Sequence, residues 1–263
     1  MTAPTVSFLN HLLREWRFTA QRTPLIMVLV GLASVLFNHL VLPLFPDRVI
    51  EFMERGFRLE DLSGVLALND LMAVYFPTFF LGLTSSLEAV ILPREEHGLE
   101  LLLAKPVPAA DFVGARTVLT LASMAAVGTT ISFAAAVAIA VNGVGASVTP
   151  IGTLGGGLTL TGLALVLVAA LAIPFVLIRD PFQGLLIASA LWLSTSIPTA
   201  VLLYRPDLYE GRVALANLVV MPSLLWHDAT IAWLGPLLFA AALAISLLLV
   251  RVAGVVLEHS DVT

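Results

Sequence analysis

The residues of this chain that could do acid–base or nucleophilic chemistry are few, and their densest group is Arg94-Glu95-Glu96-His97. A CPBP-type intramembrane protease would carry paired glutamates followed three residues later by arginine. Here the glutamate pair is followed by His97, Gly98, Leu99 and then Glu100. A rhomboid-type protease would need a Gly-x-Ser-Gly nucleophile motif, which this sequence lacks. The cluster indicates neither catalytic centre, and we predict that the chain is not an enzyme.

The sequence also lacks a motif for binding a metal or a nucleotide. Cysteine is absent, which excludes disulfides and thiolate metal sites. His227-Asp228 has no further ligand at a metal-binding spacing, so we expect no metal there. Gly155-Gly156-Gly157 lacks the Lys-Ser/Thr that completes a Walker A loop. The chain by itself is therefore expected to bind no cofactor, neither a metal nor ATP.

Polar residues within the apolar runs each have two interpretations. Glu88 lies near one end of its run, where it can reach water or pair with Arg94 rather than act inside the membrane. A single histidine such as His39, beside Asn38, is more often a hydrogen-bonding contact between helices than a ligand. A set of hydroxyl side chains suits either helix packing or the wall of a substrate path. It comprises Ser85, Ser194, Ser196 and Thr199.

The composition indicates the surroundings of these groups. Of the 263 residues, 59% are hydrophobic and only 12% are charged, and the mean hydropathy is +1.00. A soluble domain keeps about a quarter of its residues charged. Half that share of charged residues leaves too little polar surface to face water, so lipid must cover the rest of the protein surface. The net charge of -5 forms no basic patch, which argues against a nucleic-acid partner.

Six runs are long enough to cross a bilayer, which takes roughly 20 apolar residues. The uncharged stretch from Thr117 to Ile178 is too long for one helix, and Asn142-Gly143, Pro150 and Gly155-Gly156-Gly157 place its turn. Val213 to Trp226 is shorter and contains proline, which favours a re-entrant or interfacial segment before the last span. We therefore predict an all-α membrane protein with a single domain, residues 1–263. Its six spans are about 24–44, 71–92, 113–141, 157–178, 182–204 and 231–251.

Six crossings put both termini on one side of the membrane. The positive-inside rule favours the cytoplasm, because eight of the 13 Lys and Arg residues then lie inside. These eight are Arg14, Arg17, Arg22, Arg94, Lys105, Arg116, Arg179 and Arg251. We predict a multi-pass protein of the cytoplasmic (inner) cell membrane, with both termini cytoplasmic.

Two segments outside the spans are predicted to form amphipathic helices. Residues about 6–22 place Arg14 and Arg17 on one face and Trp16 on another, as in a helix that lies at the membrane interface. This elbow helix is either a plain anchor or an element that transmits force. Between the first two spans, Glu51–Arg55 is an i,i+4 pair typical of a short, solvated external helix.

The cytoplasmic connection after the second span has a pattern that is unusual for a loop. Three leucines after Gly98 share one helical face, and such a face needs a groove in a partner. Lys105-Pro106 ends this helix, and Asp111 can cap the next one, which opens the third span. A short helix, about 95–105, between two proline breaks and two long spans would act as the handle of a lever.

This connection resembles the coupling helix of ABC-2 type (type V exporter-like) permease subunits of ABC transporters. The resemblance lies in charged residues, a glycine, Glu-Leu-Leu-Leu and a proline before a span-opening helix. The elbow helix, the six spans and the re-entrant segment also have counterparts in that family, whereas Leu99 stands where the family commonly has threonine. The matching positions are Arg94, Glu95, Gly98, Glu100, Leu101, Leu102 and Pro106, and the segment also includes Glu96 and Lys105.

The resemblance implies the permease subunit of an exporter that works by alternating access. It implies two ABC ATPase subunits, which bind ATP and Mg, and a second copy of this chain or a related permease. Two rivals stay open. One is a secondary, ion-coupled transporter, for which the sequence offers neither an internal repeat nor a midplane ionisable residue. The other is a non-catalytic six-span protein with a plain amphipathic connector. The sequence does not specify the cargo, although spans with few charges suit a hydrophobic or amphipathic substrate.

Overall fold

The structure, a computed structural model, describes residues 22–57, 61–92, 109–142, 148–178, 180–204 and 234–260, with the backbone alone for 195–204. Within these ranges the chain is helical and holds no strand. The helices are α2 (Arg22–Val41), η1 (Leu42–Leu44), α3 (Asp47–Phe57), α4 (Leu62–Ser86), the π-helical turn η2 (Leu87–Ile91), α7 (Ala109–Asn142), α8 (Pro150–Phe175), α9 (Pro181–Tyr204) and α12 (Gly235–His259).

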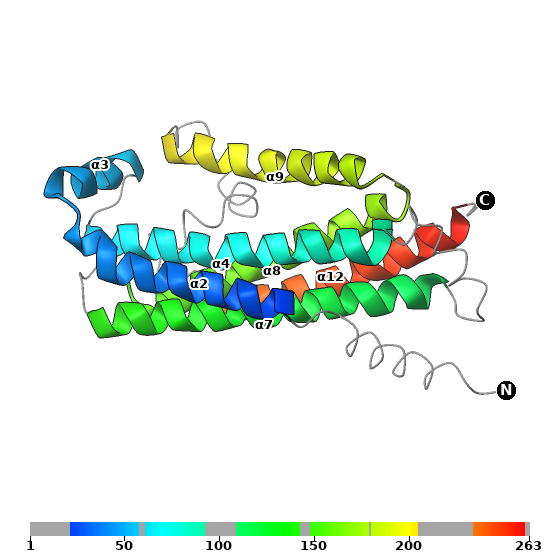
Figure 1. The fold of residues 1–263 in the computed structure, drawn as a ribbon, viewed down its shortest axis with the longest axis horizontal. Helices are drawn as coiled ribbons and strands as arrows, with labels where there is room; N and C mark the ends of the chain where they lie inside the picture. The colour runs from blue at the N-terminus through cyan, green and yellow to red at the C-terminus, as the bar shows by residue number, and fades with distance from the viewer. Residues whose placement is uncertain are drawn as a thin grey trace.

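Five helices are long and apolar enough to cross a membrane: α2, α4 with η2, α7, α8 and α12. They lie side by side as an elongated bundle (Figure 1). Leu29 and Leu40 of α2 and Leu248 of α12 are exposed on the outside, where a soluble protein would gather polar residues. Lipid covers such a surface, so the chain is an all-α membrane protein.

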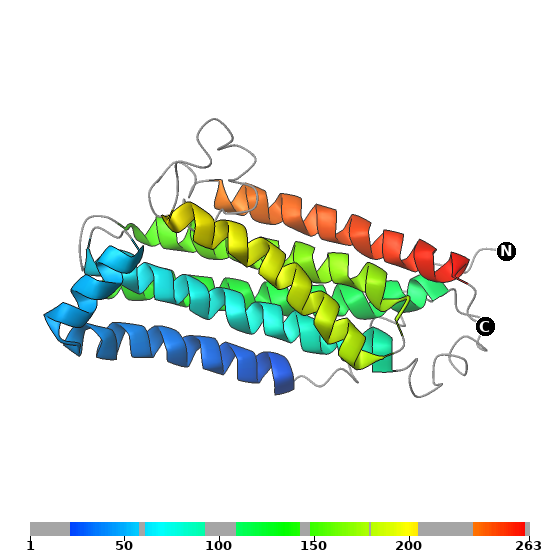
Figure 2. The ribbon, with the colours of Figure 1, turned by 90° about the horizontal axis from the view of Figure 1, so that it is seen from above.

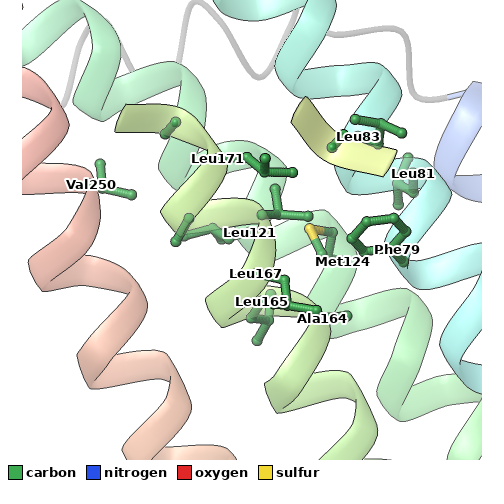
Figure 3. Close-up of a cluster of buried hydrophobic side chains, with 14 of the residues drawn as sticks. Phe79, Leu81, Leu83, Leu121, Met124, Ala164, Leu165, Leu167, Leu171 and Val250 are labelled. Atoms are coloured by element: carbon green, nitrogen blue, oxygen red, sulfur yellow. The ribbon is translucent and has the colours of Figure 1, made fainter. Parts of the chain in front are cut away.

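Helix α8 lies at the centre of the bundle, where most of its residues are buried, and its apolar residues lie on all sides. Its buried side chains meet those of α4, α7 and α12 in one cluster. Figure 3 shows Phe79 and Leu81 of α4, Met124 of α7 and Leu165 of α8 within this cluster, with Val250 on α12.

Helices α7 and α8 approach closely through two reciprocal pairs of small residues. A Cβ added at Gly128 would collide with the side chain of Thr161, and one added at Gly157 would collide with Ser132. The pairs run in opposite directions along the two helices, so the helices are antiparallel. Small residues at such positions let helix backbones come together in a membrane, where packing rather than water exclusion drives association.

Helices α8 and α12 also approach closely at small residues, but these two helices run parallel. A Cβ on Gly235 would lie 2.5 Å from the Cα of Gly155, and one on Gly162 would lie 2.9 Å from the Cβ of Ala242. Our prediction that Gly155-Gly156-Gly157 marks a turn is therefore wrong. The three glycines lie inside α8, which begins at Pro150 after the side chain of Thr149 caps the amide of Gly152 at 3.0 Å.

The second span also begins earlier than predicted, at Leu62 instead of residue 71. Asp61 is its N-cap, since its Oδ1 accepts hydrogen bonds from the amide of Gly64 at 3.1 Å and from Ser63 Oγ. Asp70 therefore lies within α4 and not in a loop. The last helix does not stop at Arg251 as predicted but continues to His259, with the exposed Arg251 side chain free to extend toward the membrane surface.

The bundle has two ends, which we name by their elements. At the α3 end, α2 and α7 finish while α4 and α8 begin, and α3 lies there (Figure 2). At the η2 end, α4 and α8 finish, α7 and α9 begin and α12 ends. The short helix predicted between the first two spans is present as α3, where Arg55 Nη2 donates to Glu51 Oε2 at 2.9 Å. Its external location stays a prediction.

Three predicted elements fall on residues that the structure does not describe. These are the elbow helix up to residue 21, the coupling helix 95–105 and the re-entrant segment 213–226.

Candidate functional site

The predicted lever lies between two helices that the structure does describe, although its own residues lie outside the described ranges. Those residues are Arg94, Glu95, Glu96, Gly98, Glu100, Leu101, Leu102, Lys105 and Pro106. The elbow residues Arg14, Trp16 and Arg17 are also outside. The described part of this region is the pair of helix ends to which segment 93–108 is attached, at the η2 end.

The two attachment helices are joined by a hydrogen bond and by an apolar seam. Arg116 Nη1 donates to the main-chain carbonyl of Ala89 at 3.0 Å. Beside this bond, Ile91 of η2 and Val113 of α7 are buried. Further along, a Cβ on Gly82 would collide with the side chain of Met124. Helix α4 with η2 and helix α7 are thus packed together along their length, up to the points where segment 93–108 leaves and re-enters.

The π-helical turn η2 sits at this junction, immediately before the segment. A π turn interrupts the i→i+4 hydrogen-bond pattern of an α-helix and is frequent at functional sites. Asp111 lies in the first turn of α7, which begins at Ala109. Our prediction that Asp111 caps this helix is therefore wrong, but its carboxylate still lies at the positive end of the helix dipole.

Two buried hydroxyls flank the junction without a hydrogen-bond partner among the described residues. They are Ser86 Oγ, one residue before η2, and Thr117 Oγ1, next to Arg116. Glu88, within η2, is exposed, as expected for a carboxylate that reaches water or a headgroup. Its predicted partner Arg94 lies outside the described residues.

The predicted substrate-path residues are not brought together as far as the structure describes them. Ser194 is exposed on α9 and donates to the carbonyl of Leu191 at 2.7 Å. Ser85 is half-buried on α4, nine positions after Phe76, whose ring lies beside Trp192 of α9. Ser85 and Ser194 therefore sit at different levels of the bundle. The side chains of Ser196 and Thr199 are not described.

The α3 end holds a polar network that the sequence did not predict. Asp70 of α4 is fully buried and His39 of α2 nearly so. His39 Nε2 lies 2.8 Å from Asp70 Oδ2, and Asn38 Nδ2 donates to Asp70 Oδ1 at 3.1 Å. Asn142 Nδ2, at the end of α7, contacts His39 Nδ1. The prediction that His39 makes contacts between helices is confirmed, and its partner Asp70 was missed.

The predicted second span begins at residue 71 and so leaves out an ionisable residue that the structure places inside α4. This residue is Asp70, the ninth of the 25 residues of α4, nearer the α3 end than the middle. Burying a carboxylate in a membrane helix is expensive unless it is paired and hydrogen-bonded, and such residues often serve function. Within the described residues no cluster of three or more His, Asp or Glu could hold a metal ion.

Comparison of the chain with protein-family models, with curated proteins and with solved structures gives no match.

Proposed function

We propose that the chain is the membrane-spanning permease subunit of an ABC exporter, driven by separate ATPase subunits. The observation that carries the proposal is the joint between Arg116 and Ala89, together with the seam that packs α4 and η2 against α7. These two helices flank the segment whose sequence resembles a coupling helix. A displacement of that segment would move both helices together, because their ends are bonded to each other.

The path of the chain supports six crossings. Helices α8 and α12 run parallel, as their contacts at Gly155–Gly235 and Gly162–Ala242 require. We therefore propose that the chain crosses the membrane once more between Phe175 and Gly235. Helix α9 runs in the returning direction and has 24 residues, which is long enough for a bilayer. With α9 counted as a crossing, we propose that both termini are on the same side, which agrees with the charge bias toward a cytoplasmic location.

The partners follow from the family that the segment resembles. Two ATPase subunits would bind ATP and Mg and receive the coupling helix, while this chain pairs with a second copy or a related permease. The outer surface of α9 suits contact with lipid or another subunit, because Phe182, Leu185 and Leu186 are exposed while Gly184 packs on Leu87 and Ile91.

A secondary, ion-coupled transporter is the second candidate, and the Asp70–His39 pair favours it. A buried carboxylate beside a histidine is the kind of group that such transporters use to bind protons or cations. The position of Asp70 counts against this reading, because coupling sites lie near the midplane at the interface of repeats. Asp70 is instead fully buried near the α3 end.

The test is reconstitution of the full-length chain in proteoliposomes with the ABC ATPase that co-purifies with it. We expect ATP hydrolysis to rise when the permease is present. Gly98→Trp and Glu96→Lys should abolish that rise while leaving membrane insertion unchanged, because they alter the docking helix. Glu54→Lys, on α3 at the opposite end, is the matched control and should raise ATP hydrolysis by the ATPase subunits as the unaltered chain does.

Two results would overturn the proposal. One is normal permease-dependent hydrolysis in both Gly98→Trp and Glu96→Lys. The other is transport driven by an ion gradient in liposomes that contain this chain and no ATPase, which would establish the ion-coupled alternative.

A further inference from the structure

The short helix α3 has two neighbouring apolar faces with different surroundings. Ile50 and Met53 are half-buried, and Met53 packs against a small cluster at the ends of the long helices. Val49 and Phe52 lie on the second face and are 40% and 78% exposed. The first face attaches α3 to the bundle, and the second face points away from it. The cluster under Met53 comprises Leu42, Val65, Leu66 and Ile139.

The charges of α3 are ordered around its exposed apolar face. Arg48 and Arg55 stand one turn before and one turn after Phe52, at spacings of four and three that place all three side by side. The acidic residues occupy the side of the helix opposite to Val49 and Phe52. An apolar face bordered by arginines, with acids turned away from it, is typical of a helix that lies in a membrane interface. The acidic residues are Asp47, Glu51 and Glu54.

The contact made by Met53 lies at the depth where one side of a membrane begins. Charged groups at the η2 end mark the other side, namely Arg116, bonded to the carbonyl of Ala89, and the exposed Glu88. Ile139 follows Arg116 by 23 positions on α7, which is roughly 34 Å of helix at about 1.5 Å per residue. The hydrocarbon core of a bilayer is about 30 Å thick. Met53 therefore holds α3 where the headgroups of the opposite leaflet begin.

The exposed face of α3 also continues a surface that lipid already covers. Phe37 and Leu40 of α2 are 53% and 61% exposed, and Leu44, in the turn that leads into α3, is 79% exposed. Helix α3 lies beside this end of α2 (Figure 2). A Cβ added at Gly56, next to Phe52 on the helix surface, would meet no described atom within 4 Å. This continuity favours lipid over a soluble protein as the occupant of the face.

We propose that α3 is an interfacial membrane anchor. Val49 and Phe52 enter the boundary between headgroups and acyl chains, while Arg48 and Arg55 bind lipid phosphates. Arg55 also donates to Glu51, and the five N–H donors of a guanidinium allow both contacts. The proposal goes beyond the exporter function and does not depend on it, because it concerns only the contact of this chain with lipid.

The test uses a single fluorescent label, which the absence of native cysteine permits. Phe52→Cys and the neighbouring Glu51→Cys, both at exposed positions, each receive an NBD group. The full-length chain is reconstituted, one copy per nanodisc, in phosphatidylcholine. A cysteine alone is too short to leave the wet headgroup layer, whereas the attached label extends at least as far as the phenylalanine ring. Iodide quenches from water, and a lipid with a doxyl group near the headgroup end of its acyl chain quenches from the bilayer.

Iodide should quench the label at position 51 several-fold more strongly than the label at position 52, and the doxyl lipid should show the opposite preference. Equal quenching by iodide at the two positions would overturn the anchor. It would leave the apolar face to water or to another protein, which a nanodisc with one chain does not contain.

The role of the arginines is tested in the labelled Phe52→Cys chain. Arg48→Glu should raise quenching by iodide at position 52, because phosphates repel a carboxylate and the face withdraws from the bilayer. Asp47→Asn, on the side turned away from lipid, is the matched control and should leave the quenching unchanged. An Arg48→Glu variant without effect, or an equal effect of Asp47→Asn, would overturn the assignment of Arg48 to lipid phosphate.

Discussion

Arg116 of α7 and Ala89 of η2 are joined by a hydrogen bond of 3.0 Å from guanidinium to main-chain carbonyl, although they lie 27 positions apart in the chain. The intervening residues contain the segment 93–108, which resembles a coupling helix. The bond thus closes the base of a loop that protrudes from two long helices. A loop closed in this way transmits a push to both helices, whereas an open loop would absorb it by separating them.

The first prediction concerns this bond. Arg116→Met keeps much of the apolar stem but removes the donor, so it should lower the free energy of unfolding by about 1–2 kcal/mol. Titration with SDS in mixed micelles measures the loss, and amide hydrogen exchange should rise at residues 87–91. Arg251→Met, at an exposed position on α12, is the control. Equal losses in the two variants would mean that the bond contributes nothing specific.

The neighbouring hydroxyl gives a prediction of opposite sign. Thr117 Oγ1 is buried and has no hydrogen-bond partner among the described residues. Because an unsatisfied buried polar group is destabilising, the isosteric Thr117→Val should raise the free energy of unfolding by about 1 kcal/mol. In the control Thr130→Val the lost hydroxyl is exposed and bonded to the carbonyl of Ala126 at 2.7 Å, so no gain is expected. A loss of stability in Thr117→Val would reveal a partner for this hydroxyl.

The contact between α7 and α8 can be tested by one methyl group. Gly157→Ala places a Cβ 2.6 Å from the Cβ of Ser132, and overpacking of this kind costs about 1–3 kcal/mol. Adding Ser132→Gly should restore more than half of the loss. Gly56→Ala, where an added Cβ has nothing within 4 Å, should instead stabilise helix α3 by about 0.5–1 kcal/mol. The measurement is again unfolding in SDS, and additive losses in the double variant would contradict the proposed collision.

Much of the fold could be predicted because apolar runs long enough to span a membrane can be recognised in the sequence alone. The errors have physical reasons. Gly155-Gly156-Gly157 was interpreted as a turn because glycine commonly marks turns, but in membrane helices small residues also mark close packing. Which of the two applies depends on Gly235, 80 residues from Gly155 in the chain.

The predicted second span begins at residue 71 and leaves Asp70 outside, whereas the structure places this carboxylate inside α4, where its burial is costly. Its cost is offset by Asn38 and His39, more than 30 positions earlier, and no local pattern shows that pairing. One signal was available: Asp61-Leu62-Ser63-Gly64 has the form of a helix start, with a capping residue before an apolar run. Recognising it would have placed Asp70 inside the helix.

The strength of the Asp70–His39 pair is the fourth prediction. Asp70→Ala alone should cost roughly 3 kcal/mol or more, because it leaves a buried partner uncompensated. A double-mutant cycle with His39→Ala should give a coupling energy of about 1–2 kcal/mol. The exposed Arg55–Glu51 pair, with side chains 80% and 55% exposed, is the matched comparison and should give about 0.3–0.5 kcal/mol. Additive effects of Asp70→Ala and His39→Ala would show that the two groups are not paired.

The last prediction concerns the path of the chain through the membrane. Single cysteines at Phe52, Asp180 and His259, all exposed, are labelled with a membrane-impermeant maleimide in intact and in permeabilised cells. We expect Phe52→Cys to react in intact cells, because α3 lies at the end opposite to both other positions, and Asp180→Cys and His259→Cys to react only after permeabilisation.

If Asp180→Cys and His259→Cys are labelled from the same side of the membrane, the chain must cross it an even number of times between these two positions. Helix α12 supplies one, and among the described helices α9 is the one that can supply the other. Asp180→Cys and His259→Cys on opposite sides would exclude the sixth crossing by α9. The reverse pattern, with Phe52→Cys protected in intact cells, would place segment 93–108 outside the cytoplasm, where no ATPase could reach it, and the exporter proposal would fail with the orientation.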